Sequence, residues 1–456
     1  MAMEILTGKN IRTLIIFAAS LAAGFAVSRF APEGLSDAGR VTLGIFTIAA
    51  LLWILEPFPL YVTSFIIVAL EVVLLGRAGG PLGFSGNQYA IFLKPFFNPV
   101  VVLFLGGFVM ADALKRYKLD ERISRSILRR VGTRPKSVLL GMMVTTAFLS
   151  MWISNTATTA LMIAVAIPLM RPFSPEERFR KAILLGIPFA ANIGGMGTPI
   201  GTPPNAIAMG ILDNMGIGIS FTGWMIRGLP LVAVLLLVCW FVLCRIFPAT
   251  IKNIDVNIPD EEEALGVKSK FILSVFAVVI LLWLTTKYHR IPSSMVALLP
   301  VIVFFGLRIL DDEDFKDLGW SVLFIIGGGM SLGIAMKESG LSTWIVGLIP
   351  FEGIGLLPVL FLFAFSAAAM TTFISNSATA NLLIPISVGI GTVPHVTSAV
   401  VIALAASAAM ILPISTPPNA IAYGSGQIEV KDMAKSGAII TLISVVVVTL
   451  FIFLLF

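Results

Sequence analysis

Two short polar clusters interrupt long apolar runs, and each cluster occurs twice in the chain. Residues 153–160 read Ile-Ser-Asn-Thr-Ala-Thr-Thr-Ala, and residues 374–381 read Ile-Ser-Asn-Ser-Ala-Thr-Ala-Asn, 221 positions later. Residues 201–208 and 415–422 share Thr-Pro-Pro-Asn-Ala-Ile-Ala after their first residue, 214 positions apart. A single cluster of this kind is more often a helix–helix hydrogen bond or a kink. Two clusters repeated in the same order indicate one site built from two halves.

The side chains of these clusters supply neutral oxygen atoms. Ser, Thr and Asn offer hydroxyl and amide oxygens, and Asn also donates two N–H bonds. Hard cations such as Na⁺ bind oxygen ligands, and broken helices add free backbone carbonyls. Each cluster precedes a new helix segment, whose N-terminus attracts anions. Four such N-termini, at Thr156, Thr202, Ser377 and Thr416, predict a place for an anion.

Neither polar tip and neither broken helix segment contains Lys, Arg or His. A bound anion would therefore be compensated by helix N-termini and by bound cations. Binding of the anion and of the cations would then be thermodynamically coupled. If two or more Na⁺ accompany the anion, the sodium gradient drives its import.

The composition identifies a polytopic, all-α membrane protein. Of the 456 residues, 57% are hydrophobic and 12% are charged, whereas soluble proteins carry about 25% charged residues. Continuous apolar runs of roughly 20 residues are typical of spanning helices, whereas a membrane β-barrel would alternate. We interpret the net charge of +6 as basic cytoplasmic loops rather than a nucleic-acid surface. An enzyme is not expected, because the intramembrane acids Glu56 and Glu71 have no His or Cys partner.

About eleven transmembrane helices and two re-entrant hairpins account for the apolar runs. The hairpins are predicted at 137–170 and 355–391, with the two Ser-Asn tips at their turns. A basic stretch at 115–136 predicts an amphipathic helix along the membrane surface. We expect the spans at 11–30, 39–55, 60–75, 99–114, 179–212 (broken at 194–205), 221–247, 271–288, 293–310, 321–336, 396–423 (broken at 413–418) and 433–456.

The distribution of basic residues predicts the orientation. A cytoplasmic N-terminus and an outside C-terminus place most of the 31 Lys and Arg residues on the cytoplasmic side. Spans 2–6 and 7–11 then run in opposite senses, which makes the halves an inverted repeat. The polar loop 252–270 separates them, and we interpret its acidic run 260–263 as a solvated linker. Compact loops and the lack of a recognisable targeting segment favour a bacterial inner membrane.

The two Ser-Asn tips, the two Thr-Pro-Pro-Asn segments and Glu-Pro-Phe-Pro-Leu at 56–60 together resemble the divalent anion/sodium symporter family. That family includes sodium-coupled dicarboxylate, citrate and sulfate transporters. The resemblance covers nearly the whole chain and implies a homodimer that works as an elevator in membrane lipid. It implies scaffold helices 1–4 with an interfacial helix in 1–135, and a linker with scaffold helices 7–9 in 251–352. The moving transport parts would be the first hairpin with helices 5 and 6 in 136–250, and the second hairpin with helices 10 and 11 in 353–456. A second interfacial helix would lie near 341–348.

The resemblance also implies roles for single residues. A first sodium site would use Ser150, Ser154, Asn155 and the Gly201 carbonyl. A second would use Thr371, Asn376 and the carbonyls of Ile374 and Ser415. Substrate carboxylates would contact Asn155, Thr156, Thr202, Asn376, Ser377 and Thr416.

These observations favour import of a C4-dicarboxylate, such as succinate, malate or fumarate, with two or more Na⁺ as co-transported ions. Ser377 stands where many dicarboxylate transporters have Thr, which leaves the identity of the small divalent anion open. The alternatives are a sodium-independent dicarboxylate exchanger, or a carrier of sulfate or citrate on the same fold. A channel is not expected, because a channel would not need a binding site built from two repeated halves. We expect a second copy of the chain and lipid as partners, and no nucleic acid.

Overall fold

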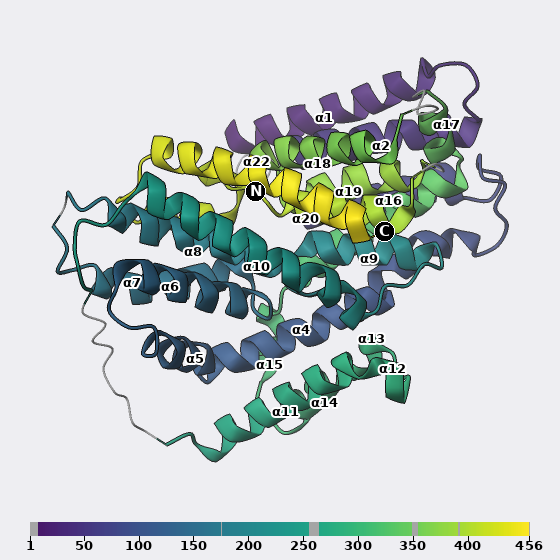
Figure 1. The fold of residues 1–456 in the computed structure, drawn as a ribbon. Coiled ribbons are helices and arrows are strands. Elements are labelled where there is room, and N and C mark those ends of the chain that lie inside the picture. The colour runs from purple at the N-terminus through teal and green to yellow at the C-terminus, as the bar shows by residue number, and fades with distance from the viewer. Residues whose placement is uncertain (1–7, 175, 255–263, 349–353, 391–392, 456) are drawn as a thin grey trace.

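The computed structural model describes residues 8–174, 176–254, 264–348, 354–390 and 393–455. The described residues form helices, turns and loops, without a strand among them. The acidic run 260–263 and residue 391, at the end of the expected second hairpin, lie outside these ranges. Figure 1 shows most of the long helices running in roughly the same direction or its reverse.

Seven of the described helices are long and apolar enough to cross a membrane. They are Asn10–Arg29, Asp37–Leu55, Phe221–Ile246, Val267–Leu284, Asp312–Glu338, Leu356–Phe373 and Val430–Leu455. Shorter apolar helices accompany them at Leu60–Gly76, Pro135–Ser150, Asn155–Leu169, Ser293–Gly306 and His395–Ala406. Leu356–Phe373, expected as half of a hairpin, thus has the length of a full span.

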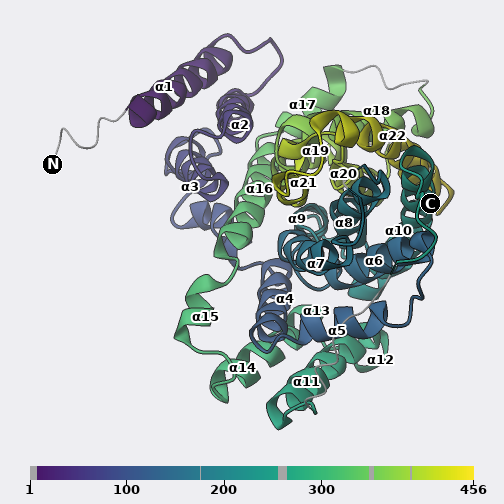
Figure 2. The same cartoon turned by 90° about the vertical axis from the view of Figure 1, so that its left-hand side faces the viewer.

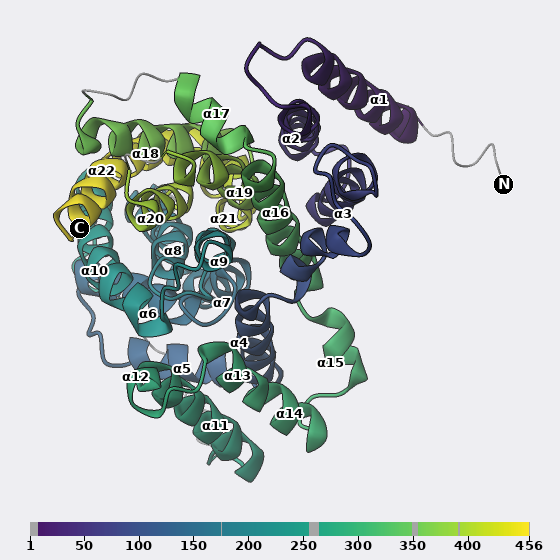
Figure 3. The same ribbon diagram turned by 90° about the vertical axis from the view of Figure 1, so that its right-hand side faces the viewer.

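The N-terminal helices form one flank of the molecule (Figures 2 and 3). They are α1 (Gly8–Arg29), α2 (Asp37–Leu55), α3 (Leu60–Leu70) and the π-helical turn η1 (Glu71–Gly76). The Ser36 hydroxyl caps α2 by accepting a bond from the Gly39 amide. Glu56 ends α2 in the left-handed region at φ 44°, and Pro59 precedes α3. The Glu-Pro-Phe-Pro stretch therefore separates two helices, as expected from its prolines.

A loop with two short 3₁₀ turns leads from this flank into the centre. The turns are η2 (Gln88–Phe92) and η3 (Lys94–Phe97), followed by α4 (Pro99–Arg116) and α5 (Leu119–Leu128). In α5, Leu119 and Leu128 are buried, whereas Glu121 is half-buried and Arg122 is exposed. The expected amphipathic helix is therefore present, although it is shorter than the basic stretch that predicted it.

Two chain segments with the same plan build the centre. The first comprises α6 (Pro135–Ser150), α7 (Asn155–Leu169), α8 (Phe179–Gly195), α9 (Pro203–Asn214) and α10 (Phe221–Ile246). The second comprises α18 (Leu356–Phe373), α19 (Asn376–Val388), α20 (His395–Ala406), η4 (Pro413–Ser415), α21 (Pro417–Gly424) and α22 (Val430–Leu455). In Figures 2 and 3, α7, α8, α9, α19, α20 and α21 lie together in the middle of the molecule.

The remaining helices lie between the two central segments in sequence. They are α11 (Val267–Leu284), α12 (Thr286–His289), α13 (Ser293–Val296), α14 (Leu298–Gly306), α15 (Asp312–Asp317), α16 (Trp320–Glu338) and α17 (Leu341–Leu348). Helices α11 to α14 form a second flank, whereas α16 runs beside the centre (Figure 2). The helix expected near 341–348 is α17.

Close glycine contacts tie the flanks to the centre in a crossed pattern. Helix α4 packs against α13 and α14, where a Cβ on Gly106 would lie 2.2 Å from the Ala297 carbonyl oxygen. Helix α16 packs against α3, where a Cβ on Gly328 would lie 2.3 Å from the Ser64 Cβ. Each half therefore supplies a glycine-bearing helix to the other, and the halves interlock.

Candidate sodium and anion site

The two Ser-Asn tips are turns that end one helix and cap the next. Helix α6 ends at Ser150, and the Ser154 hydroxyl accepts a bond from the Ala157 amide (3.3 Å) at the start of α7. In the second half, the Ser375 hydroxyl accepts a bond from the Ala378 amide (3.1 Å) at the start of α19. A Ser N-cap satisfies one free amide and leaves the others of the first turn available.

A buried hydroxyl lies behind the first tip. The Ser150 Oγ lies 2.5 Å from the Asn155 Oδ1 and 2.8 Å from the Ala191 carbonyl oxygen. A hydroxyl has one hydrogen, so it cannot satisfy both acceptors fully. We call these three oxygens the first oxygen cluster; it is richer in lone pairs than in donors, which is the chemistry that a hard cation requires.

The second half repeats this arrangement atom for atom. The Thr371 Oγ1 lies 2.7 Å from the Asn376 Oδ1 and 2.8 Å from the Ala406 carbonyl oxygen. Thr371 is fully buried, as is Ser150. We call these atoms the second oxygen cluster. The repeat of the motif in sequence is thus a repeat of geometry, with Thr in place of Ser.

The breaks after α8 and α20 are held open by an asparagine from each Thr-Pro-Pro-Asn segment. The Asn205 Nδ2 donates to the carbonyl oxygens of Gly195 (2.9 Å) and Thr198 (2.8 Å). The Asn419 Nδ2 donates to the equivalent carbonyl oxygens of Ala409 (3.2 Å) and Leu412 (3.0 Å). Buried carbonyls released from a helix need such partners, because an unpaired one is costly.

The second break begins earlier than its prolines predict. Helix α20 ends at Ala406, whereas we expected the break at 413–418. The released Ala408 carbonyl oxygen accepts a bond from the Thr441 hydroxyl (2.8 Å) on α22. A Cβ on Gly437 would lie 1.9 Å from the Met410 carbonyl oxygen, so α22 also packs directly on this backbone. Tertiary partners, rather than proline alone, therefore end the helix.

Both tips and both breaks meet in one cavity of about 880 Å³. We call it the central cavity. Ser150 and Thr371 lie behind its wall, bonded to the two asparagines that line it. Glu56 is the one charged side chain among its described lining residues. The lining includes the remaining residues expected at the site: Ser154, Asn155, Thr156, Gly201, Thr202, Ile374, Asn376, Ser377, Ser415 and Thr416.

Four helix N-termini face this cavity. The N-cap residues of α7, α9, α19 and α21 are Ser154, Thr202, Ser375 and Thr416, and all four line it. Each N-terminus carries roughly half a positive charge and free amides. The cavity thus combines oxygen-rich clusters behind its wall with four positive dipole ends at its surface. This arrangement suits an anion held beside cations.

The structure adds residues that the sequence did not single out. Asn192 lines the central cavity, and its Nδ2 lies within hydrogen-bond distance of the Thr416 Oγ1 (3.3 Å) and the Asn419 Oδ1 (3.4 Å). It joins the first half to the second. Trp152 also lines the cavity, and its ring stacks on Phe221 at 6.4 Å. Asn192 occurs in only one half, so the repeat that revealed the other residues gave no signal for it.

Comparisons with known proteins agree with this architecture. The chain is 33% identical to the "Sodium-dependent dicarboxylate transporter SdcS" of Staphylococcus saprophyticus, over 93% of this chain and 88% of that protein. It is also 33% identical to the protein of the same name from Staphylococcus aureus strain USA300, over 93% of this chain and 87% of that protein.

Two solved structures share the fold at 12% sequence identity. One is MtrF of Neisseria gonorrhoeae, described as one of a class of antimetabolite efflux pumps, with a TM-score of 0.54 over 95% of this chain and 96% of that one. The other is the YdaH transporter of Alcanivorax borkumensis, with a TM-score of 0.52 over 89% of this chain and 97% of that one.

The profile of the family described as "Sodium:sulfate symporter transmembrane region" matches residues 9–455. That range includes both Ser-Asn tips, both Thr-Pro-Pro-Asn segments and the seven helices long enough to cross a membrane. The expected resemblance to the divalent anion/sodium symporters is thereby confirmed. The chain is an integral membrane protein that belongs to this symporter family.

Proposed function

We propose that the protein imports a C4-dicarboxylate together with two or more Na⁺. The observation that carries the proposal is the pair of equivalent oxygen clusters behind two helix N-termini in one cavity. The names of its relatives, sodium-dependent dicarboxylate transporters, support both the ion and the substrate class. Sulfate, citrate and sodium-independent exchange are the alternatives that the experiment below separates.

Each oxygen cluster is assigned one sodium ion. The first ion is bound by Ser150, Ser154, Asn155 and the Gly201 carbonyl, and the second by Thr371, Asn376 and the carbonyls of Ile374 and Ser415. Close packing supports the first assignment, because a Cβ on Gly195 would lie 2.8 Å from the Asn155 Oδ1 and 3.0 Å from the Gly201 carbonyl oxygen. The amide and the carbonyl therefore converge beside one glycine.

The dicarboxylate is assigned to the surface of the central cavity. One carboxylate contacts Asn155 and Thr156 on α7, and the other contacts Asn376 and Ser377 on α19. Thr202 and Thr416 complete the set at the N-termini of α9 and α21. Without a basic side chain on the described lining, the charge of the substrate is balanced by the helix dipoles and by the two ions. Binding of the sodium ions therefore raises the affinity for the substrate, and binding of the substrate raises the affinity for sodium.

Movement is assigned to an elevator. The two re-entrant hairpins, α6–α7 and α18–α19, move with the helices after them (136–250 and 353–456) against the scaffold (1–135 and 251–352). The dimer forms through the scaffold, in a bacterial inner membrane with the N-terminus in the cytoplasm. The basic stretch 115–136, which contains α5, supports this orientation, since it suits a cytoplasmic surface.

Succinate uptake into liposomes that contain the purified protein tests the proposal. The first arm has an inward sodium gradient, the second has choline instead, and the third has choline with succinate preloaded inside. We expect uptake in the first arm only. Uptake that needs preloaded succinate would make the protein an exchanger. If succinate is not taken up but sulfate or citrate is taken up with sodium, the proposed substrate is wrong and the proposed sodium coupling is supported.

A further inference from the structure

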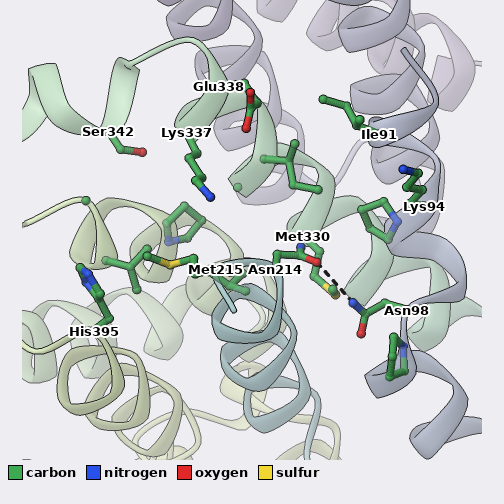
Figure 4. A pocket seen from close by; sticks show the side chains of 18 of the residues that line it. Ile91, Lys94, Asn98, Asn214, Met215, Met330, Lys337, Glu338, Ser342 and His395 are labelled. Carbon is green, nitrogen blue, oxygen red and sulfur yellow. Dashed lines mark hydrogen bonds between the residues drawn. The ribbon is translucent and has the colours of Figure 1, made fainter. Parts of the chain in front are cut away.

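A second large cavity, of about 1000 Å³, lies at the other ends of the helices that line the central cavity. Helix α9 starts at the central cavity with Pro203 and reaches the second cavity with Asn214. Its 12 residues span about 18 Å. Helices α4, α16 and α19 likewise contribute residues to both cavities. We call the second one the Lys337 cavity; Figure 4 shows it.

Tight packing separates the two cavities. A Cβ on Gly210 of α9 would lie 2.4 Å from the Met330 sulfur on α16. A Cβ on Gly329 of α16 would lie 1.7 Å from the Asn381 Oδ1 on α19. These contacts pack α9 against α16 and α16 against α19 in the region between the two cavities. The basic stretch 115–136 and the Lys337 cavity are at opposite ends of α4, which places the cavity on the outer face under the proposed orientation.

The two cavities differ in charge. The described lining of the central cavity carries Glu56 alone, whereas the Lys337 cavity is lined by Lys94, Lys337, His395 and one acid, Glu338. In Figure 4, Lys337 and His395 lie across the cavity from Lys94. Glu338 offsets part of this positive charge, and the two lysines leave the described lining with an excess of one positive charge when His395 is neutral.

The lysines are available to a ligand. Among the described residues, neither Lys94 nor Lys337 forms an ion pair, and both side chains are exposed. The nearby carboxylate of Asp213 instead accepts a bond from the Asn98 Nδ2 (3.2 Å). Two ammonium groups thus remain to bind negative oxygen atoms.

Resting on the proposed function, we propose that the Lys337 cavity is an outer binding vestibule for a small dicarboxylate. Lys94 and Lys337 attract the dianion and hold it weakly before it reaches the paired site. A cavity with an excess of positive charge raises the local concentration and the association rate of an anionic ligand. The attraction falls with ionic strength, because exposed charges are screened over about 8–10 Å.

The first test measures sodium-driven succinate uptake from the outer face in cells. We expect the double variant Lys94→Gln/Lys337→Gln to raise KM about fivefold, with the maximal rate within about twofold of the parent. Adding choline chloride at fixed sodium should raise the KM of the parent and leave that of the variant nearly unchanged. Lys94→Arg/Lys337→Arg keeps the charge and should behave as the parent, and so should Lys287→Gln on α12, away from the cavity.

The second test does not depend on transport. A reporter thiol, Thr343→Cys, is placed on the cavity wall at an exposed position, with Cys244→Ser and with the buried Cys239 kept. An anionic thiosulfonate should label it faster, relative to a cationic one, when both lysines are present. Loss of the lysines should lower this ratio about threefold. Succinate should slow labelling, whereas the neutral succinamide should not.

The outcomes separate the vestibule from the proposed function. An unchanged labelling ratio without protection by succinate overturns the vestibule, even where the parent transports succinate well. Lysine-dependent labelling with protection supports the vestibule, even where liposome uptake of dicarboxylates is absent and the proposed function fails. If the parent transports succinate and the double lysine-to-glutamine variant has the same KM, that result also counts against the vestibule.

Discussion

Each oxygen cluster places one hydroxyl beside the amide oxygen of a tip asparagine. Ser150 and Thr371 fix the orientation of the asparagine amides, since each places an O–H within reach of an amide oxygen. The amide nitrogen of each asparagine is then free of that hydroxyl and available to a substrate oxygen. In the proposed site, one side chain would contact the ion through oxygen and the dianion through nitrogen. Coupling between the two ligands would then be a property of single residues.

Replacing either asparagine should therefore abolish transport. Asn155→Ala and Asn376→Ala each remove one cation ligand and one substrate donor, and we expect at least about a 100-fold loss of sodium-driven succinate uptake. Asn253→Ala, at an exposed loop position, is the matched control. Gel filtration should give the same elution volume for all three. Near-normal uptake by either variant would show that the replaced asparagine is not part of the sodium and substrate site.

The hydroxyls should affect sodium more than substrate. Thr371→Val keeps the shape of the side chain and removes the oxygen, so we expect the half-saturating sodium concentration to rise about fivefold. Saturating sodium should restore most of the uptake rate. Thr371→Ser retains the hydroxyl, as Ser150 does in the first half, and should resemble the parent. Equal sodium dependence in the Val and Ser variants would contradict a cation at this cluster.

Repetition decides which residues the sequence can reveal. Asn155 and Asn376 stand in equivalent motifs, so their pairing was predictable, and the structure brings both to one cavity. Asn192 joins the halves by bonding at Thr416, but it lies outside both repeated motifs. Its role depends on a contact between distant segments. A single sequence contains no trace of such a contact.

At the level of elements, the broken helices depend on partners for their free carbonyls. Pro203-Pro204 and Pro417-Pro418 predict where a new helix starts, because proline fits the first turn of a helix. They do not predict where the preceding helix ends. The end of the second broken helix depends on Asn419 and Thr441, which donate hydrogen bonds to the carbonyl oxygens of Ala409 and Ala408. The sequence therefore locates the breaks to within a few residues, and the packing sets their length.

Close approach of α8 to α6 predicts a stability effect at Gly194. A Cβ there would lie 2.4 Å from the Ala147 carbonyl oxygen and 2.5 Å from its Cα, and this backbone cannot move aside cheaply. We expect Gly194→Ala to cost about 1–3 kcal/mol and to lower the thermal unfolding midpoint in detergent by several degrees. Gly306→Ala is the control, because no atom lies within 4 Å of its added Cβ.

The control matters because Ala favours a helix over Gly by up to about 1 kcal/mol at either site. Gly306→Ala reports that gain alone, whereas Gly194→Ala reports the gain and the clash together. A midpoint for Gly194→Ala equal to or above that of Gly306→Ala would show that α6 and α8 separate more easily than the structure indicates.

In the whole molecule, the two cavities lie at opposite ends of the same four helices, and tight helix contacts lie between them. The Gly329–Asn381 contact is part of that layer and joins α16 to α19. Asn381 also donates to the Ile325 carbonyl oxygen (3.2 Å) on α16. In the proposed elevator, α16 belongs to the scaffold and α19 to the moving part. Transport then requires this contact to break in every cycle.

A reversible crosslink at this contact tests the movement. An ideal Cβ on Gly329 lies 2.1 Å from the Asn381 Cγ, so Cys side chains at both positions come within bonding reach, and loss of the Asn amide makes room for the new Cβ. We expect oxidation of Gly329→Cys/Asn381→Cys, with Cys239→Ser and Cys244→Ser, to stop sodium-driven uptake, and reduction to restore it. The single variant Asn381→Cys, oxidised in the same way, and the double variant kept reduced throughout should both keep their uptake. Full transport with the bond formed would mean that α16 and α19 move together, and the boundary between scaffold and transport part would then lie elsewhere.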